Sequence, residues 1–427
     1  MFVPNSFTDG VAGGTPITAA TLNNLENGLV AADVTNPASA AAVAIATLGA
    51  TYAPAATPAG LALTKRFDPA RQVYNLTSSS FRRWRAALGA AANGTAIARL
   101  NCYGDSITFG AFATPNSSVA NAPQRLRERI AKRTSVTGTG VVYPIDYSGS
   151  DLRWTFAGSW STLNGYGPFG FGCQQVAAIT DNVTFAPLEA IDTFAITYYS
   201  NTPTGIIRIQ VDGGTATTLD TSNATGLSVQ TSTIAAGSAG IHTLKITAPA
   251  DGKPFFLIGI EASAGTSGIR VTTCAKTGTK YSDLMLDAVG DNRASPVAAI
   301  DSNKPNLAIL HFGMNEYFQQ VPIATFTANA QAAIDRVRVT NLGDVLLVMT
   351  NPDGGVLKTI PQTAYQQALY GLADTNNVPL LDLYERWGSY AISNATPLAL
   401  YGDTAHPNSR GYADHASALF DIVMAGM

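Results

Sequence analysis

Charged side chains and cysteines are scarce in this sequence. Only 13% of the 427 residues are Asp, Glu, Lys or Arg, and 26 basic against 29 acidic residues give a formal net charge of −3. No block of basic residues stands out, which argues against nucleic-acid binding. The three cysteines lack metal-site spacing and cannot all pair, so Cys102 and Cys274, in strand-like runs, are interpreted as buried thiols. The third is Cys173.

Long apolar runs and a secretory leader are also missing. No run reaches the ~18 residues that a membrane span needs, and the nearest, 38–50, is Ala-rich and interrupted by Ser39 and Thr47. The first residues lack the basic and apolar segments of a signal peptide. We therefore expect no membrane span. If the protein acts outside the cell, its release by cell lysis, inside an assembled particle, would explain the missing signal peptide. The four histidines are too scattered for a zinc site, and we expect no metal and no organic cofactor.

Apolar residues make up 46% of the chain, enough for a sizeable core, and 427 residues exceed what one domain usually holds. Outside the middle of the chain, apolar runs alternate with helical patterns, which indicates a mostly parallel sheet covered on both faces. The expected strands are 97–102, 269–274, 306–312, 345–350 and 378–383. The expected helices are 80–92 (capped by Ser79 or Ser80), 119–133 (arginines outward), 323–339, 362–374 and 410–424.

The middle of the chain, from about residue 141 to 264, has a different texture. Helical periodicity disappears, and apolar residues such as Ile207 and Ile209 alternate with polar ones. Gly213-Gly214 supplies a turn after which 215–219 returns as a partner strand. Several short strands at this spacing suggest a β-sandwich.

A dense group of aromatic residues lies among glycines in this middle region. Such rings would suit a platform on which sugars stack, whereas burial in a core or in a seam between domains is the alternative that we favour. The group consists of Trp154, Phe156, Trp160, Tyr166, Phe169 and Phe171.

The first 60 residues differ from the rest. Leucines recur at helical spacing across 21–34, and 38–59 is rich in Ala, Pro and Thr, as linkers are. The stretch 14–26 resembles the N-terminal segment of tail fibre and minor tail proteins of phages that infect actinobacteria; an ordinary amphipathic leader helix is the alternative. The resemblance implies attachment to other phage tail proteins, and the short apolar seam is compatible with a homotrimer.

Three short blocks carry the chemistry. Gly104-Asp105-Ser106 follows a predicted strand, and a serine at the carboxyl end of a strand, just before a helix, lies where open α/β sheets bind ligands. Gly313-Met314-Asn315-Glu316 follows another strand, and Asp403-Thr404-Ala405-His406 lies near the C-terminus. In this order the blocks resemble those of the SGNH (GDSL-like) hydrolase family, which read Gly-Asp-Ser, Gly-x-Asn-Asp and Asp-x-x-His.

The resemblance implies a domain organisation. Residues 61–140 and 266–427 would form the two parts of an SGNH-hydrolase domain, a three-layer α/β/α fold with a parallel sheet. Residues 141–265 would be an inserted, jelly-roll-like β-sandwich similar to carbohydrate-binding modules. Residues 1–60 would be a short helical anchor and linker for tail attachment.

The resemblance also implies an activated serine. We expect His406 to take the proton of Ser106, and Asp403 to hold the other nitrogen of the imidazole. The donors to the oxyanion would be the backbone N–H groups of Ser106 and Gly278 and the side chain of Asn315.

Four further residues are interpreted as structural. Glu316 stands where the family has Asp, which we expect to change the support of the loop rather than the Asn donor. Asp105 is expected to shape the turn before the serine. His311 and His415 are expected to be packing or surface residues.

The reaction expected from these residues is ester hydrolysis through an acyl-Ser106 intermediate. The predicted protein is a phage tail esterase, located in the virion and acting at the host cell surface, that removes acetyl or longer acyl groups from a host envelope glycan or lipid. Two alternatives stay open: a non-catalytic receptor-binding or structural tail protein on the same scaffold, and a cellular carbohydrate esterase.

Overall fold

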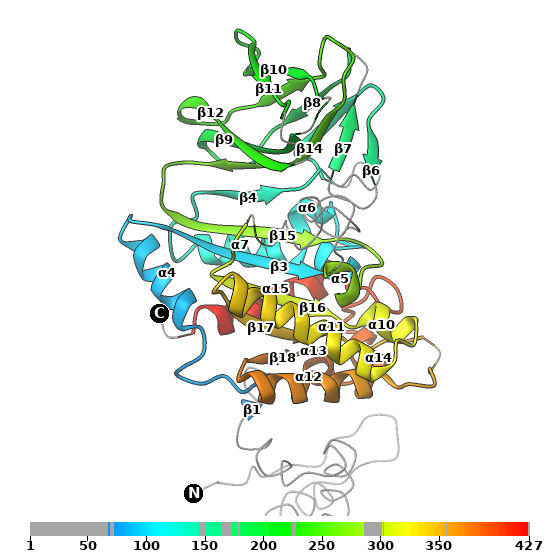
Figure 1. Ribbon diagram of the computed structural model, residues 1–427. Helices are drawn as coiled ribbons and strands as arrows, with labels where there is room; N and C mark the ends of the chain where they lie inside the picture. Colours follow the sequence, from blue (N-terminus) through cyan, green and yellow to red (C-terminus); the bar gives the residue numbers. More distant parts are fainter. Residues whose placement is uncertain are drawn as a thin grey trace, which may run out of the picture. The chain divides into compact units, whose positions relative to one another are not determined.

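A computed structural model describes the chain from residue 67 onward (Figure 1). The described residues are 67–68, 72–144, 151–163, 173–176, 180–200, 202, 204–223, 228–285, 301, 303–355 and 357–425. The predicted helix 21–34 and the linker after it lie outside the described residues, as do Tyr166, Phe169 and Phe171.

The α/β part of the described chain is organised around one sheet of seven strands, in the order β1-β2-β18-β17-β16-β3-β15. The strands from β18 to β15 are parallel, whereas β1 and β2 join the β18 edge in antiparallel pairing. Every residue of β16 is buried, because helices cover both faces of a parallel sheet. The bounds are β1 Phe67–Asp68, β2 Val73–Tyr74, β3 Ile97–Gly104, β15 Gly268–Ala275, β16 Leu307–Phe312, β17 Asp344–Met349 and β18 Leu380–Asp382.

Helices pack on both faces of this sheet. On one face, α4, α7 and α15 share a core with strand residues such as Leu100 and Ile309. Phe312 points the other way, since side chains alternate along a strand, and there it meets Tyr281, which in turn packs against Phe326 of α11. The long helices are α4 Arg82–Ala92, α7 Ala122–Ala131, α11 Ile323–Asp335, α12 Gln362–Asn376 and α15 Ser409–Val423. The parallel sheet and the mixed α/β class are as predicted.

Two expectations about the helices are wrong. Helix α4 begins at Arg82 and has no side-chain cap: Phe81 precedes it in a left-handed conformation, and the hydroxyl of Ser80 instead accepts a hydrogen bond from the N–H of Thr77. Arg127 of α7 does not face outward but is buried, because Glu189 forms an ion pair with its guanidinium. Charge alone does not place an arginine on the surface when a distant carboxylate lies within reach.

Between β4 (Gly138–Val142) and β15 the described chain forms two antiparallel sheets. One has the order β11-β10-β13-β8-β5, and the other β12-β9-β14-β7-β6 with β4 paired to β14. The predicted return strand after Gly213 is confirmed, with Ile207 opposite Leu219. The bounds are β5 Trp154–Ala157, β6 Ser161–Leu163, β7 Cys173–Val176, β8 Asn182–Phe185, β9 Ile191–Ser200, β10 Ile206–Val211, β11 Thr217–Asp220, β12 Ser228–Gly240, β13 Leu244–Thr247 and β14 Phe255–Ser263.

The two antiparallel sheets share one hydrophobic core. Val183 and Ile246 from the first sheet and Phe194 and Leu257 from the second belong to it. The described aromatic residues Trp154, Phe156 and Trp160 pack against this core and are half-buried, which favours the packing interpretation for these three rings. The jelly-roll topology and the domain boundaries at 61, 141 and 266 stay predictions.

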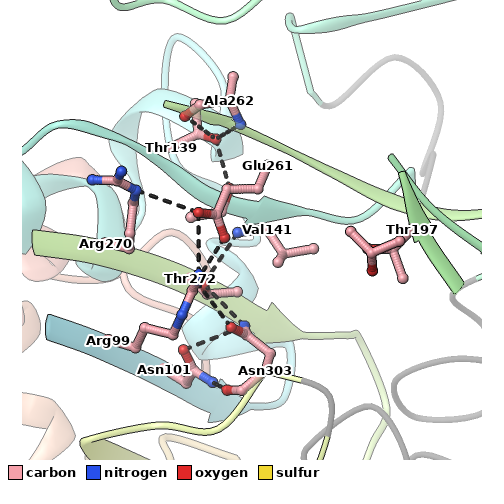
Figure 2. A network of polar contacts seen from close by, with 12 residues as sticks. Arg99, Asn101, Thr139, Val141, Thr197, Glu261, Ala262, Arg270, Thr272 and Asn303 are labelled. Carbon is pink, nitrogen blue, oxygen red and sulfur yellow. Dashed lines mark hydrogen bonds and ion pairs between the residues drawn. The ribbon is translucent and has the colours of Figure 1, made fainter. Parts of the chain in front are cut away.

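A buried charge cluster joins β14 to the parallel sheet (Figure 2). Arg99 of β3 and Arg270 of β15 lie side by side in register. Both donate to the carboxylate of Glu261 on β14, with Nη1 of Arg99 at 2.6 Å and Nε of Arg270 at 3.4 Å. Asn303 accepts a further hydrogen bond from Arg99 at 3.2 Å. Since Arg270 is completely buried, Glu261 is what compensates its charge.

Replacing Glu261 with alanine is expected to destabilise the protein by about 3–5 kcal/mol, because two guanidinium groups, one of them fully buried, lose their counter-charge. Urea unfolding measures this change. Asp251→Ala is the matched control, because Asp251 forms a solvent-exposed pair with Lys253 and its loss should cost far less. Equal effects of the two substitutions would contradict the assignment of Glu261 as the essential counter-charge.

Candidate active site

The predicted site residues come together at one edge of the parallel sheet. Ser106 begins the short helix α5 (Ser106–Phe109) directly after β3, and Asn315 lies in α10 (Met314–Phe318) directly after β16. Gly278 follows the end of β15. Because β15, β3 and β16 are parallel neighbours, their carboxyl ends meet at the same edge.

Ser106, His406 and Asp403 form a continuous hydrogen-bonded chain. Oγ of Ser106 lies 2.8 Å from Nε2 of His406, across 300 positions in the sequence. Nδ1 of His406 lies 2.9 Å from Oδ2 of Asp403. An ionised carboxylate accepts hydrogen bonds and donates none, so Nδ1 carries a proton and Nε2 is free to accept the proton of the serine hydroxyl. The arrangement of nucleophile, base and orienting carboxylate is that of a serine hydrolase.

Asp403 is fixed by its own loop. The N–H groups of Ala405 and His406 donate to its Oδ1 at 2.8 and 2.6 Å. Partial burial raises the pKa of Asp403, but these donors and the imidazole outweigh it and hold the pKa below its ordinary value. The N–H of Gly402 donates to the carbonyl of His406 at 2.8 Å and closes the loop. The carboxylate is therefore ionised and aligned before any substrate arrives.

Asn315 and the Gly278 loop lie against the turn that carries Ser106. Nδ2 of Asn315 donates to the carbonyl of Thr279 at 3.0 Å and approaches Oδ2 of Asp105 at 3.4 Å. The hydroxyl of Thr279 donates to the carbonyl of Gly104 at 3.2 Å. Gly278 has φ +79°, a conformation that favours glycine. Both loops therefore lie next to the turn of Ser106, and the oxyanion donor roles of Ser106, Gly278 and Asn315 stay predictions.

Asp105 shapes the turn, as expected. Its Oδ1 accepts a hydrogen bond from the N–H of Ile107 at 2.8 Å and so caps α5. Burial, with a smaller contribution from the charge of Glu316, raises the pKa of Asp105 to about 7. A side chain at Gly104 would collide with the carbonyl of His311, 2.7 Å from an added Cβ, so glycine is required before this turn.

Glu316 supports the loop, in agreement with the sequence-based interpretation. Its carboxylate accepts hydrogen bonds from the N–H of Gly313 at 3.0 Å and from the N–H of Tyr281 at 2.8 Å. It thereby connects the block that carries Asn315 to the segment that follows Gly278. Burial raises the pKa of Glu316 to about 7, although the two backbone donors act in the opposite direction.

The remaining histidines and cysteines of the described core are packing residues. Burial lowers the pKa of His311 to about 3 and that of His415 to about 4, so both are neutral. Cys102 and Cys274 are free and buried, as expected. Within the described ranges, no group of His, Cys, Asp and Glu is arranged to hold a metal ion. None of the helices in the same ranges is long and apolar enough to cross a membrane.

Two features of the site were missed from the sequence. The ring of Phe112 stacks on the imidazole of His406, with 5.4 Å between the centroids. Asn351, after β17, donates to the carbonyl of Ala405 at 2.9 Å and so supports the loop that carries His406. Neither residue belongs to a short motif, and their positions follow from contacts between distant segments, so no pattern along the chain indicated them.

Comparison with known proteins supports this interpretation. Residues 260–413 match the family model of the GDSL-like lipases/acylhydrolases, a stretch that includes Gly278, Asn315, Asp403 and His406. Ser106 precedes the matched stretch, and the fold brings it to His406. No curated protein matches the chain by sequence.

Among solved structures, one described as a peptidoglycan O-acetylesterase in action has a TM-score of 0.64 and 20% identity. The match covers 82% of this chain and 97% of that one, and it shows a shared fold. A family two carbohydrate esterase from Cellvibrio japonicus matches with a TM-score of 0.27 and 11% identity over 67% of this chain and 99% of that one, a likeness too low to carry an argument.

The fold and the site thus define a serine hydrolase with a mixed α/β domain. More particularly, residues 260–413 match the model of the GDSL-like lipases/acylhydrolases, and the chain is a serine esterase.

The raised pKa of Glu316 predicts a pH-dependent contribution to stability. The group ionises near 4.5 in the unfolded chain but at about 7 in the folded protein, so its stabilising contribution is complete below 4.5 and is lost as the pH rises to about 7. Glu316→Gln cannot ionise at this position. The unfolding free energy of the wild type minus that of the variant is therefore expected to fall as the pH rises from 4.5 to 7. Urea unfolding at pH 4.5, 6 and 7.5 measures this quantity, and a rise with pH would refute the expectation.

Proposed function

We propose that this esterase removes acyl groups, with acetyl as the first candidate, from the glycan of a bacterial envelope. The observation that carries the proposal is the chain of hydrogen bonds from Ser106 through His406 to Asp403. The likeness to the solved structure described as a peptidoglycan O-acetylesterase supports an acetylated glycan as the substrate class.

In the proposed reaction, Nε2 of His406 takes the proton of Ser106 while Oγ attacks the ester carbonyl. Asp403 stabilises the imidazolium that forms. The imidazolium then gives its proton to the leaving alcohol, and the acyl group remains on Oγ of Ser106. Water, deprotonated by the same nitrogen, attacks this acyl-enzyme, releases the carboxylic acid and restores the serine.

The negative charge on the carbonyl oxygen would be met by three donors. The backbone N–H of Ser106, the backbone N–H of Gly278 and the amide of Asn315 are proposed for this role. The amide of Asn315 donates to the carbonyl of Thr279 at 3.0 Å, and this hydrogen bond holds its position before the reaction. Preorganised donors of this kind each contribute about a hundred- to a thousandfold in rate.

The acyl group is tested with p-nitrophenyl esters from acetate to long chains, for wild type and Ser106→Ala. We expect the wild type to prefer acetate and the variant to lose turnover by about a millionfold, because no nucleophile remains. O-acetylated peptidoglycan should release acetate with the wild type alone. A preference for long chains would replace the glycan by an envelope lipid as the substrate. A wild type no faster than the variant on any ester or on host envelope would leave a binding protein on this scaffold.

A second part of the proposal concerns location. We propose that the protein is carried by a phage tail as a homotrimer and acts at the host cell surface. Its support is the resemblance of residues 14–26 to tail proteins of actinobacteriophages.

This location predicts that the full chain is present in purified virions. Mass spectrometry of density-purified particles should detect its peptides. Their amount relative to the other tail proteins should correspond to a multiple of three copies per virion. Peptides confined to uninfected cells would indicate a cellular carbohydrate esterase instead.

A further inference from the structure

An exposed aromatic side chain lies beside the histidine of the site. The rings of Phe112 and His406 are stacked, with 5.4 Å between their centroids and 30° between their planes. Phe112 is nevertheless 56% exposed, more than any other aromatic residue among the large hydrophobic residues exposed in the described chain. One side of the phenyl ring therefore meets the imidazole, and much of the rest is open to solvent at the site. An apolar surface left open in this place is available to a substrate.

The fold holds Phe112 in an unfavourable conformation. Its φ is +64°, in the left-handed region that bulky residues avoid. The loop is fastened on both sides of it. The hydroxyl of Tyr412 donates to the carbonyl of Ala111 at 2.6 Å, and the N–H of Thr114 donates to Oγ of Ser409 at 2.8 Å. Both partners belong to α15, so the helix that follows His406 also sets the position of Phe112.

A glycine makes room for the ring. A Cβ added to Gly402 would lie 2.7 Å from Cβ of Phe112, so any larger residue would displace the phenylalanine. Gly402 also closes the loop that carries Asp403 and His406. Phe112 thus packs on the backbone of the histidine loop as well as on the imidazole.

The reaction geometry indicates which part of the substrate meets Phe112. In the proposed mechanism the leaving alcohol takes its proton from His406, so it must lie on the imidazole side. The carbonyl oxygen turns the other way, toward Gly278 and Asn315. A residue stacked on the imidazole is therefore a neighbour of the alcohol part of the ester and not of the acyl part.

We propose that Phe112 is a specificity-determining residue that stacks with the sugar ring carrying the ester. The inference rests on the proposed function, in which the leaving alcohol is a sugar hydroxyl. The C–H face of a pyranose is apolar, and its burial against the phenyl ring would remove both surfaces from water. The contact would orient the sugar so that its esterified oxygen lies at Nε2 of His406.

The test compares two acetate esters that differ in the alcohol: soluble fragments of O-acetylated peptidoglycan, and ethyl acetate, which has no ring. For Phe112→Ala we expect kcat/KM to fall about three- to tenfold on the glycan, and to change less than about twofold on ethyl acetate. Phe112→Trp should keep the activity on the glycan, because it keeps an aromatic face. Val339→Ala, which truncates an exposed apolar residue of the short helix η2 (Arg336–Thr340), is the control and should change neither rate.

Each other outcome has a definite meaning. Equal losses on both esters, with a shifted pH profile, would make Phe112 a positioning residue for His406 and overturn the sugar contact. An altered preference for acyl length at a constant alcohol would place the ring on the acyl side and also overturn it. A wild type that hydrolyses ethyl acetate but no glycan ester would overturn the proposed substrate together with this role. Because both esters are measured on one preparation, partial unfolding of a variant lowers both rates and does not imitate the expected result.

Discussion

The in-register parallel pairing of β3 with β15 and β16 is the constraint on which the site depends. It brings the ends of three strands, separated by up to about two hundred residues of sequence, to one edge of the sheet. Ser106, the Gly278 loop and Asn315 each follow one of these ends. The histidine loop is then added from the C-terminal side, where the hydrogen bond between Ser106 and His406 joins the first and last parts of the domain.

The site is held by groups that do not react. Asp105 caps the nucleophile helix, and Glu316 connects two backbone segments, each from a buried position that raises its pKa to about 7. Burying carboxylates is costly unless hydrogen bonds compensate them. Here the backbone N–H groups of Ile107, Gly313 and Tyr281 offset part of this cost. The geometry of the reactive atoms therefore rests on a shell of buried, hydrogen-bonded carboxylates.

The antiparallel sheets between β4 and β15 are tied to the hydrolase domain through charge as well as packing. Glu261 of β14 holds Arg99 and Arg270 on the two strands that lead to Ser106 and to Gly278 (Figure 2). A movement of β14 would disturb both strands together. The same strands thus carry the reactive loops at one end and the attachment of the antiparallel sheets at the other.

The local elements and the types of the reactive residues could be predicted from the amino-acid sequence. Apolar runs indicate the parallel strands, because burial on both faces requires continuous apolar residues. The Gly-Asp-Ser, Gly-x-Asn and Asp-x-x-His blocks indicate the reactive residues, because each block is a short pattern within a few residues of one element. Features that depend on distant residues could not be predicted in this way. Arg127 is buried because it forms an ion pair with Glu189, and Ser80 accepts a hydrogen bond from Thr77 instead of capping α4. Phe112 stacks on His406 because its loop is hydrogen-bonded to α15. Such contacts depend on the relative position of elements in space, which local propensity does not encode.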